Sequence, residues 1–159
     1  MKRSAGIVVL CALAIVAAVA SYAFWSGSAA GSATGAAGSA LSMTITPGTP
    51  SAELAPGGTA GVAATISNPN LFGVRITQLS LDSGAGTGGF AVDAAHPGCV
   101  TTALSYIKQT NGGAGWTVPA KVGAVNGSLP VTLSAALAMS DAAPDACQGA
   151  GFTVFLVAG

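Results

Sequence analysis

Charged side chains are scarce in this sequence, and so are the side chains that carry most enzyme chemistry. Only 6 % of the 159 residues are charged, against roughly 25 % in an average globular protein. Five Lys or Arg balance five Asp or Glu, which leaves no basic stripe for nucleic-acid phosphates and no acidic tail. The chain has one histidine and 6 % aromatic residues. These shortages argue against a nucleic-acid-binding protein and against an enzyme.

The N-terminus has the pattern of an export signal. Lys2 and Arg3 precede an almost wholly apolar or small run from Ala5 to Trp25. As a helix at ~1.5 Å per residue the run would be ~31 Å long, enough to cross a bilayer core of ~30 Å. Small residues in Ser21-Tyr22-Ala23 also suit a signal peptidase. Residues 1–25 are therefore predicted to be a signal peptide or a membrane anchor, with the remaining chain outside the cytoplasm.

A second interpretation of the N-terminus stays open. Residues 2–6, Lys-Arg-Ser-Ala-Gly, lie before an apolar run and resemble a short type IV pilin leader that is cut after a glycine. Cys11 occupies the position where most such pilins carry Glu. A pilin-like subunit is therefore one alternative for the function.

Residues 26–40 form a linker of only Ser, Gly, Ala and Thr. Such a segment has nothing to bury that would offset its loss of conformational entropy, and as a flexible coil it would span on the order of 20 Å. The linker separates the N-terminal apolar segment from residues 41–159. These residues are long enough for one ordinary domain.

Residues 41–159 read as short extended segments separated by turns rich in Gly, Pro and Asn. Five segments have extended patterns: Leu41–Thr46, Val62–Ile66, Val74–Asp82, Val131–Leu137 and Phe152–Val157. The apolar positions of the third shift parity after Ile76, which predicts a bulge near Thr77-Gln78 or burial on both faces. The fifth is apolar on both faces and is placed centrally. We predict an all-β fold, an Ig-like antiparallel sandwich of about seven strands, preceded by a hydrophobic helix and the linker.

Cys99 and Cys147 are the cysteines outside the apolar N-terminus. Export would remove them from the reducing cytosol, so we predict that they form a disulfide, with two free thiols as the alternative. The bridge would contribute about 4 kcal/mol in the chain-entropy model. His96 precedes Cys99 by three positions, but a zinc site needs three or four ligands. We interpret His96 as a turn residue.

Two further patterns were weighed as cofactor or metal sites. The segment Gly84–Gly89 satisfies G-x-G-x-x-G, but a β-like segment follows where a dinucleotide site requires a helix, so we predict a hairpin loop. Asp93, Asp141 and Asp145 could converge on Ca²⁺, but three carboxylates are too few, and they are predicted to be solvated turn acids. A Ser-His-Asp triad could be built only around His96. No catalytic, cofactor-binding or metal-binding residue is predicted.

Several short motifs resemble known families. Residues 21–26, Ser-Tyr-Ala-Phe-Trp-Ser, resemble the aromatic motif that follows the apolar stretch in camelysin/TasA-type bacterial surface proteins. The segments Pro56–Gly58, Ile66–Asn70 and Asp145–Gly149, the last leading into Phe152–Val154, look like small exported bacterial Ig-like domains. The resemblance implies a β-sandwich and a role in surface fibres or matrix.

The expected function is that of an exported, non-catalytic surface, matrix or envelope module. Open β-sandwiches have edge strands that must be covered or paired, and this chain has few Lys or Glu to protect them. We therefore expect contacts with an envelope protein, a matrix component or a second copy, with Leu41–Thr46 as the favoured contact strand. The N-terminal helix would add membrane contact if it is retained. A monomeric extracytoplasmic binding module is the alternative.

Overall fold

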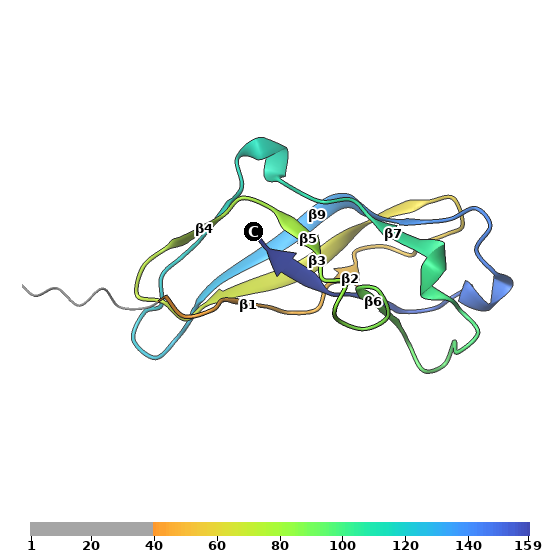
Figure 1. Cartoon of the computed structure of the whole chain (residues 1–159), viewed down its shortest axis with the longest axis horizontal. Coiled ribbons are helices and arrows are strands. Elements are labelled where there is room, and N and C mark those ends of the chain that lie inside the picture. The colour runs from red at the N-terminus through yellow and green to blue at the C-terminus, as the bar shows by residue number, and fades with distance from the viewer. Residues whose placement is uncertain (1–39) are drawn as a thin grey trace, which may run out of the picture. The chain divides into compact units, whose positions relative to one another are not determined.

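The computed structural model describes residues 40–159, and these residues form the all-β fold that the sequence predicts (Figure 1). They make eleven strand segments and three one-turn 3₁₀ helices, η1 (Thr101–Ala103), η2 (Asn111–Gly113) and η3 (Asp145–Cys147), with no α-helix. The predicted signal peptide or anchor, its helix and most of the linker lie outside the described residues. No helix in the described part of the chain has the length and apolarity needed to span a membrane.

The largest sheet has five antiparallel strands built around two long ones. In spatial order β1 is followed by β3, β9 and β7, and β2 pairs with the same edge of β3 as β1 does. The strands are β1 (Thr44–Ile45), β2 (Thr49–Pro50), β3 (Thr59–Asn68), β7 (Leu104–Tyr106) and β9 (Gly127–Met139). Chain segments far apart in sequence, residues 59–68 and 127–139, thus form the centre of the sheet (Figure 1).

The other six strands form three antiparallel pairs. Strand β10 pairs with β6, β11 with β5, and β8 with β4. Their bounds are β4 (Val74–Ile76), β5 (Leu79–Leu81), β6 (Phe90–Val92), β8 (Trp116–Val118), β10 (Phe152–Val154) and β11 (Leu156–Ala158). Tyr106 of β7 connects the sheet to β5, because its hydroxyl donates to the Leu79 carbonyl over 3.2 Å. Burial raises the pKa of this hydroxyl to about 12, so it remains a donor at neutral pH.

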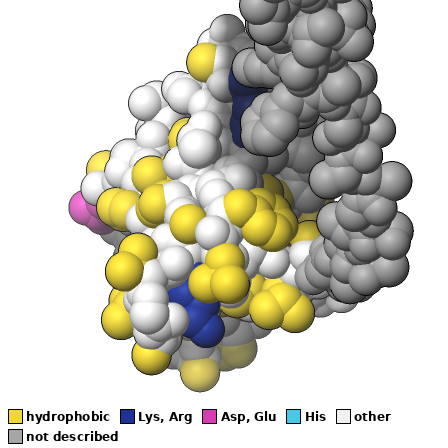
Figure 2. Space-filling view, turned by 90° about the vertical axis from the view of Figure 1, so that its left-hand side faces the viewer, with side chains coloured by type: hydrophobic (Ala, Val, Ile, Leu, Met, Phe, Trp, Pro, Cys, Tyr) yellow, Lys and Arg dark blue, Asp and Glu magenta, His cyan; other side chains and the backbone are white. Residues whose placement is uncertain are grey.

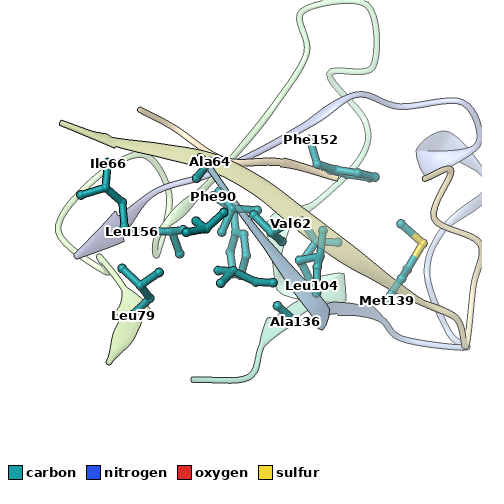
Figure 3. Packing of buried hydrophobic residues seen from close by; sticks show 14 of the residues in the cluster. Val62, Ala64, Ile66, Leu79, Phe90, Leu104, Ala136, Met139, Phe152 and Leu156 are labelled. Carbon is teal, nitrogen blue, oxygen red and sulfur yellow. The ribbon is translucent and has the colours of Figure 1, made fainter. Parts of the chain in front are cut away.

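The core lies against one face of the five-stranded sheet. Alternate residues of β3 are buried, as expected for a strand with one face on a core, and Val62 and Ile66 have no exposed surface. These side chains pack in one cluster with residues of β5, β6, β8, β10 and β11. Figure 3 shows this packing, with Phe90, Leu79 and Leu156 beside the residues of β3. The strand pairs therefore cover the buried face of the sheet.

Two strand predictions can be compared with the structure directly. The irregularity expected near Thr77-Gln78 is a break between β4 and β5, since β4 ends before Thr77. The N–H groups of Thr77 and Gln78 donate to the Gly159 carbonyl over 2.8 and 3.1 Å. The predicted strand Phe152–Val157 is divided at Phe155 into β10 and β11. The strand was expected to lie centrally. Its first part does, since β10 has β6 on one side and Gly48 on the other, whereas among the described residues β11 pairs with β5 alone and Val157 is 47 % exposed.

Strand β9 contains a bulge that changes its neighbours. Ala60 pairs with Leu137 but Val62 pairs with Leu133, so three residues of β9 oppose one residue of β3. Ala135, inside the bulge, has a positive φ of 47°. Beyond the bulge β9 pairs with β7 as well as β3, whereas before it β3 is the only strand among residues 40–159 that pairs with β9.

Candidate functional site

A disulfide joins Cys99 to Cys147, the pair expected from the sequence. Their Cα atoms are 4.6 Å apart, and both residues are buried in the core cluster. The bond links the loop after β6 to η3, in the loop between β9 and β10. A buried disulfide of this kind is typical of proteins in oxidising compartments. We call this region, with the loops that it joins, the disulfide end.

Asp93 and His96 are joined by a hydrogen bond beside the disulfide. The imidazole Nδ1 lies 2.8 Å from one carboxylate oxygen of Asp93, which also accepts the Ala95 N–H over 2.9 Å. The other oxygen accepts the Gly151 N–H. The hydrogen bond from His96, followed by that from Gly151, holds the pKa of Asp93 below its usual value. The pair ties the β6 turn to the start of β10, which is a turn role for His96.

The acidic residues that were weighed as a Ca²⁺ site do not converge with one another. Asp141 and Asp145 are exposed, and the Asp93 carboxylate is occupied by its own turn and by Gly151. Within residues 40–159, no three His, Cys, Asp or Glu side chains are grouped as a metal site requires.

The Gly84–Gly89 segment is a tight loop between β5 and β6, and a strand follows it rather than a helix. Gly89 has a positive φ of 94°, and a Cβ there would clash with the Leu81 side chain, so the turn requires glycine. The loop was predicted correctly, but it does not connect a hairpin. Strands β5 and β6 pair with β11 and β10, not with each other.

The disulfide end also contains a groove that the sequence analysis missed. It has a volume of about 340 Å³ and is lined by Leu54, Met139 and Cys147 together with the carboxylates of Glu53 and Asp145. The lining comes from residues 53–56 and 139–149, which meet because the Gly57 N–H donates to the Met139 carbonyl over 3.1 Å. A local sequence motif cannot predict this groove, because its two walls come from loops that are far apart in the sequence.

The first edge of the five-stranded sheet is formed by β1 and β2. The Thr46 N–H donates to the Thr65 carbonyl over 2.9 Å, so these residues form a hydrogen-bonded pair. Because such pairs alternate along antiparallel strands, the Thr44 N–H also points toward β3. The Ile45 N–H and C=O point away from β3, toward the open edge.

The other edge of β9 is open between Ser128 and Ala135. Among the described residues, β7 pairs with β9 only from Leu137 to Met139. Thr65, whose polar backbone groups face β1, pairs with Pro130, so the Pro130 nitrogen points toward the open edge. The Pro50 nitrogen of β2 also points away from β3, since Ser51 donates to Gly61, but β10 lies on that side because Gly48 pairs with Val154. The open edge of β9 thus carries a proline where a partner strand would need a donor.

Five exposed apolar side chains lie at the opposite end from the disulfide. They are Leu41, Leu71, Phe72, Val122 and Val125, with 53–80 % of their surface exposed. We call them the apolar end. Figure 2 looks onto this end and shows hydrophobic side chains crowded over it with basic side chains nearby. Large apolar residues in turns are the sequence signal for this surface.

Two buried asparagines hold the apolar end together. The Asn68 side chain donates to the carbonyls of Phe72 and Pro119, both over 2.9 Å. The Asn70 side chain accepts the Leu41 N–H over 2.7 Å, donates to the Leu41 carbonyl, and donates to Asn68. These bonds fix the start of the domain, the β3–β4 turn and the β8–β9 turn against one another.

No family model matches the chain, and comparisons with curated proteins and with solved structures also gave no match. The function is therefore inferred from the residues and their arrangement.

Proposed function

We propose that this protein is an exported, non-catalytic structural module of the cell surface, matrix or envelope, acting through protein–protein contacts. It is secreted or tethered to the outer face of the cytoplasmic membrane. The Lys2-Arg3 start with its apolar run supports export, and the disulfide supports an oxidising compartment. The partner is an envelope protein, a matrix component or another copy of this chain.

We further propose that residues 41–159 are an Ig-like β-sandwich. The five-stranded sheet would be one layer and the three strand pairs the other, with the core cluster between them. Gly48, between β1 and β2, pairs with Val154 of β10, so the first strand contacts both layers. Joining β1 with β2, β4 with β5 and β10 with β11 brings the eleven segments close to the expected strand number.

The observation that carries the proposed contacts is the exposed edge of β1. Strand β1 has only two residues paired with β3, and three residues separate it from the predicted linker. No charged side chain occurs between Leu41 and Pro50, although charges are the usual protection of an edge. The Ile45 N–H and C=O are turned outward and can pair with a strand of a partner.

The test replaces the outward donor at position 45. Ile45→Pro removes this N–H, whereas Ile45→Ala keeps it and removes more of the side chain. Thr44→Pro serves as a third variant, since its N–H faces β3 and its loss weakens the domain itself. The measurement is chemical cross-linking of the full-length chain to its partners on cells that export it. We expect Ile45→Pro to reduce this cross-linking and Ile45→Ala to leave it at the wild-type level.

A different result would reject assembly through this edge. If the wild-type protein stays monomeric at high concentration and all three variants associate with the surface equally, contacts do not use β1. The groove beside the disulfide would then favour a monomeric binding module.

A further inference from the structure

The apolar end differs from the rest of the described surface in both hydrophobicity and charge. The two turns that form it, residues 68–73 and 119–126, contain one charged residue, Lys121, and no acid. Leu71 and Val122 are 80 % and 78 % exposed, so the structure gives these side chains almost no packing of their own. An exposed apolar surface of this kind is typical of a site that contacts another protein or a membrane.

Four of the five acidic residues lie at the other end of the long strands, and the fifth, Asp82, directly follows β5. Glu53 and Asp145 line the groove, Asp141 lies against Gly57, and Asp93 binds Gly151. Strand β3 separates the two ends by roughly 30 Å at ~3.3 Å per residue. One end is therefore apolar with a cation, and the other is acidic.

The chain enters the domain at the apolar end. Leu41 belongs to it, and the Leu41 backbone is held by Asn70. Residues 26–40 before it are the linker predicted from the sequence, and a coil of that length would span on the order of 20 Å. If residues 1–25 remain in the membrane, the apolar end is the part of the domain that lies nearest to the lipid.

We propose that the apolar end rests in the outer surface of the membrane, with its five side chains among the upper acyl chains and Lys121 at the level of anionic headgroups. Apolar side chains beside a basic one are suited to the interface, and the acidic end would be repelled from it. This inference rests on the proposed membrane tether. It directs the groove and the disulfide end away from the membrane, where envelope partners can reach them.

The arrangement that Asn68 and Asn70 maintain favours lipid, rather than a second copy of the chain, as the partner that covers the apolar end. The hydrogen bonds of Asn68 hold two short turns together, and Leu71 and Val122 project from these turns with 80 % and 78 % of their surface exposed. Gly127 maintains this arrangement, because a Cβ at that position would clash with the Pro119 carbonyl. Protruding turns with exposed aliphatic tips can enter a lipid surface without a complementary partner.

The test places a tryptophan at the apolar end of the full-length chain. In a background with Trp25→Phe and Trp116→Phe, we would compare Phe72→Trp and Val125→Trp with Val100→Trp at the disulfide end. Phe72 and Val100 are similarly exposed, at 53 % and 50 %. The variants are reconstituted in phosphatidylcholine/phosphatidylglycerol vesicles, with and without bromine on the upper acyl chains. We expect bromine to quench Phe72→Trp and Val125→Trp but not Val100→Trp.

Three results would overturn the inference. If the chain floats with vesicles but all variants are quenched equally weakly, the tether stands and the apolar end does not touch lipid. If the tryptophan of Phe72→Trp emits at a shorter wavelength than that of Val100→Trp but is not quenched by bromine, protein rather than lipid covers this surface. If the full-length chain does not float with vesicles, the tether itself fails, and the lipid contact fails with it.

Discussion

At the scale of single residues, two buried asparagines do what no apolar residue could do at their positions. Asn68 is completely buried, and its side chain serves two backbone carbonyls and the neighbouring Asn70. No buried side-chain N or O atom lacks a hydrogen bond in the described part of the chain. The network is therefore fully satisfied, and removing one member leaves several polar groups without partners.

Asn68→Ala should strongly destabilise the domain. The carbonyls of Phe72 and Pro119 and the Asn70 amide would lose their partner, and we expect the free energy of unfolding to fall by about 3 kcal/mol. The control is Asn126→Ala, because Asn126 is exposed and makes one 3.3 Å bond to Ser67. Its effect should stay within about 0.5 kcal/mol. Urea unfolding of both variants measures the two free energies of unfolding. Equal losses in the two variants would contradict the structural role of Asn68.

Asp93 should contribute to acid unfolding. Its pKa is lowered in the folded state by His96 and Gly151, so its contribution to stability is present above the ordinary value of 3.8 and is lost as pH falls below it. Asp93→Asn should therefore flatten the dependence of unfolding on pH in that acidic range. The matched control is Asp141→Asn, since Asp141 accepts no side-chain hydrogen bond within residues 40–159. Thermal unfolding from pH 2 to pH 6 checks this, and parallel curves for the wild type and Asp93→Asn would reject it.

At the scale of elements, β9 shows how a long strand can keep one edge open. Before its bulge, no strand of residues 40–159 covers the edge away from β3. Pro130 removes a donor in the middle of this edge, and its ring hinders the approach of another strand. At the opposite edge of the sheet, β10 pairs with Gly48 after β1, which leaves the start of that edge, at Ile45, available. This asymmetry is the physical reason for placing the proposed contacts at β1.

Pro130→Thr should increase self-association without unfolding the domain. The substitution restores an N–H that points outward from β9, and the side chain at this position is exposed. Ser128→Thr is the control, because it introduces the same residue two positions earlier and leaves the backbone donors unchanged. Light scattering over a concentration series should give a higher mean mass for Pro130→Thr alone. A monomeric Pro130→Thr variant would show that this edge is protected by other means.

At the scale of the whole molecule, the disulfide connects loops that are 48 residues apart in sequence. Closing a loop of this length restricts the unfolded chain and stabilises the fold by about 4 kcal/mol in the chain-entropy model. The bridge is also the only covalent link across the disulfide end among the described residues. It holds η3 and the groove lining against the turn that contains His96.

Alkylation of the denatured, unreduced protein should therefore leave Cys99 and Cys147 unmodified, with Cys11 excluded from the count. After reduction both should react, and the midpoint of urea unfolding should fall. Mass spectrometry of peptides from protein recovered at the cell surface measures the modification. Labelling of both cysteines before reduction would show that the bridge is absent in the cell.

The sequence by itself determined the features that depend on local pattern. Alternating apolar residues in Val62–Ile66 predicted a strand with one buried face, and turn residues separated the strands correctly at most points. The pairing of Cys99 with Cys147 followed from the small number of cysteines. The loop at Gly84–Gly89 followed from the residues after it, which favour a strand over a helix.

The tertiary structure decided what depends on which segments meet. The sequence could not place Pro130 opposite Thr65, so it could not show which N–H groups face an open edge. In the same way, Leu71 and Val122 belong to turns about fifty residues apart. The Asn68 bonds, the Lys121 N–H bond to the Asn70 carbonyl and the pairing of β4 with β8 bring those turns together at the apolar end. Strand register and long-range hydrogen bonds are set by the packing of the whole chain, and a local pattern carries no record of them.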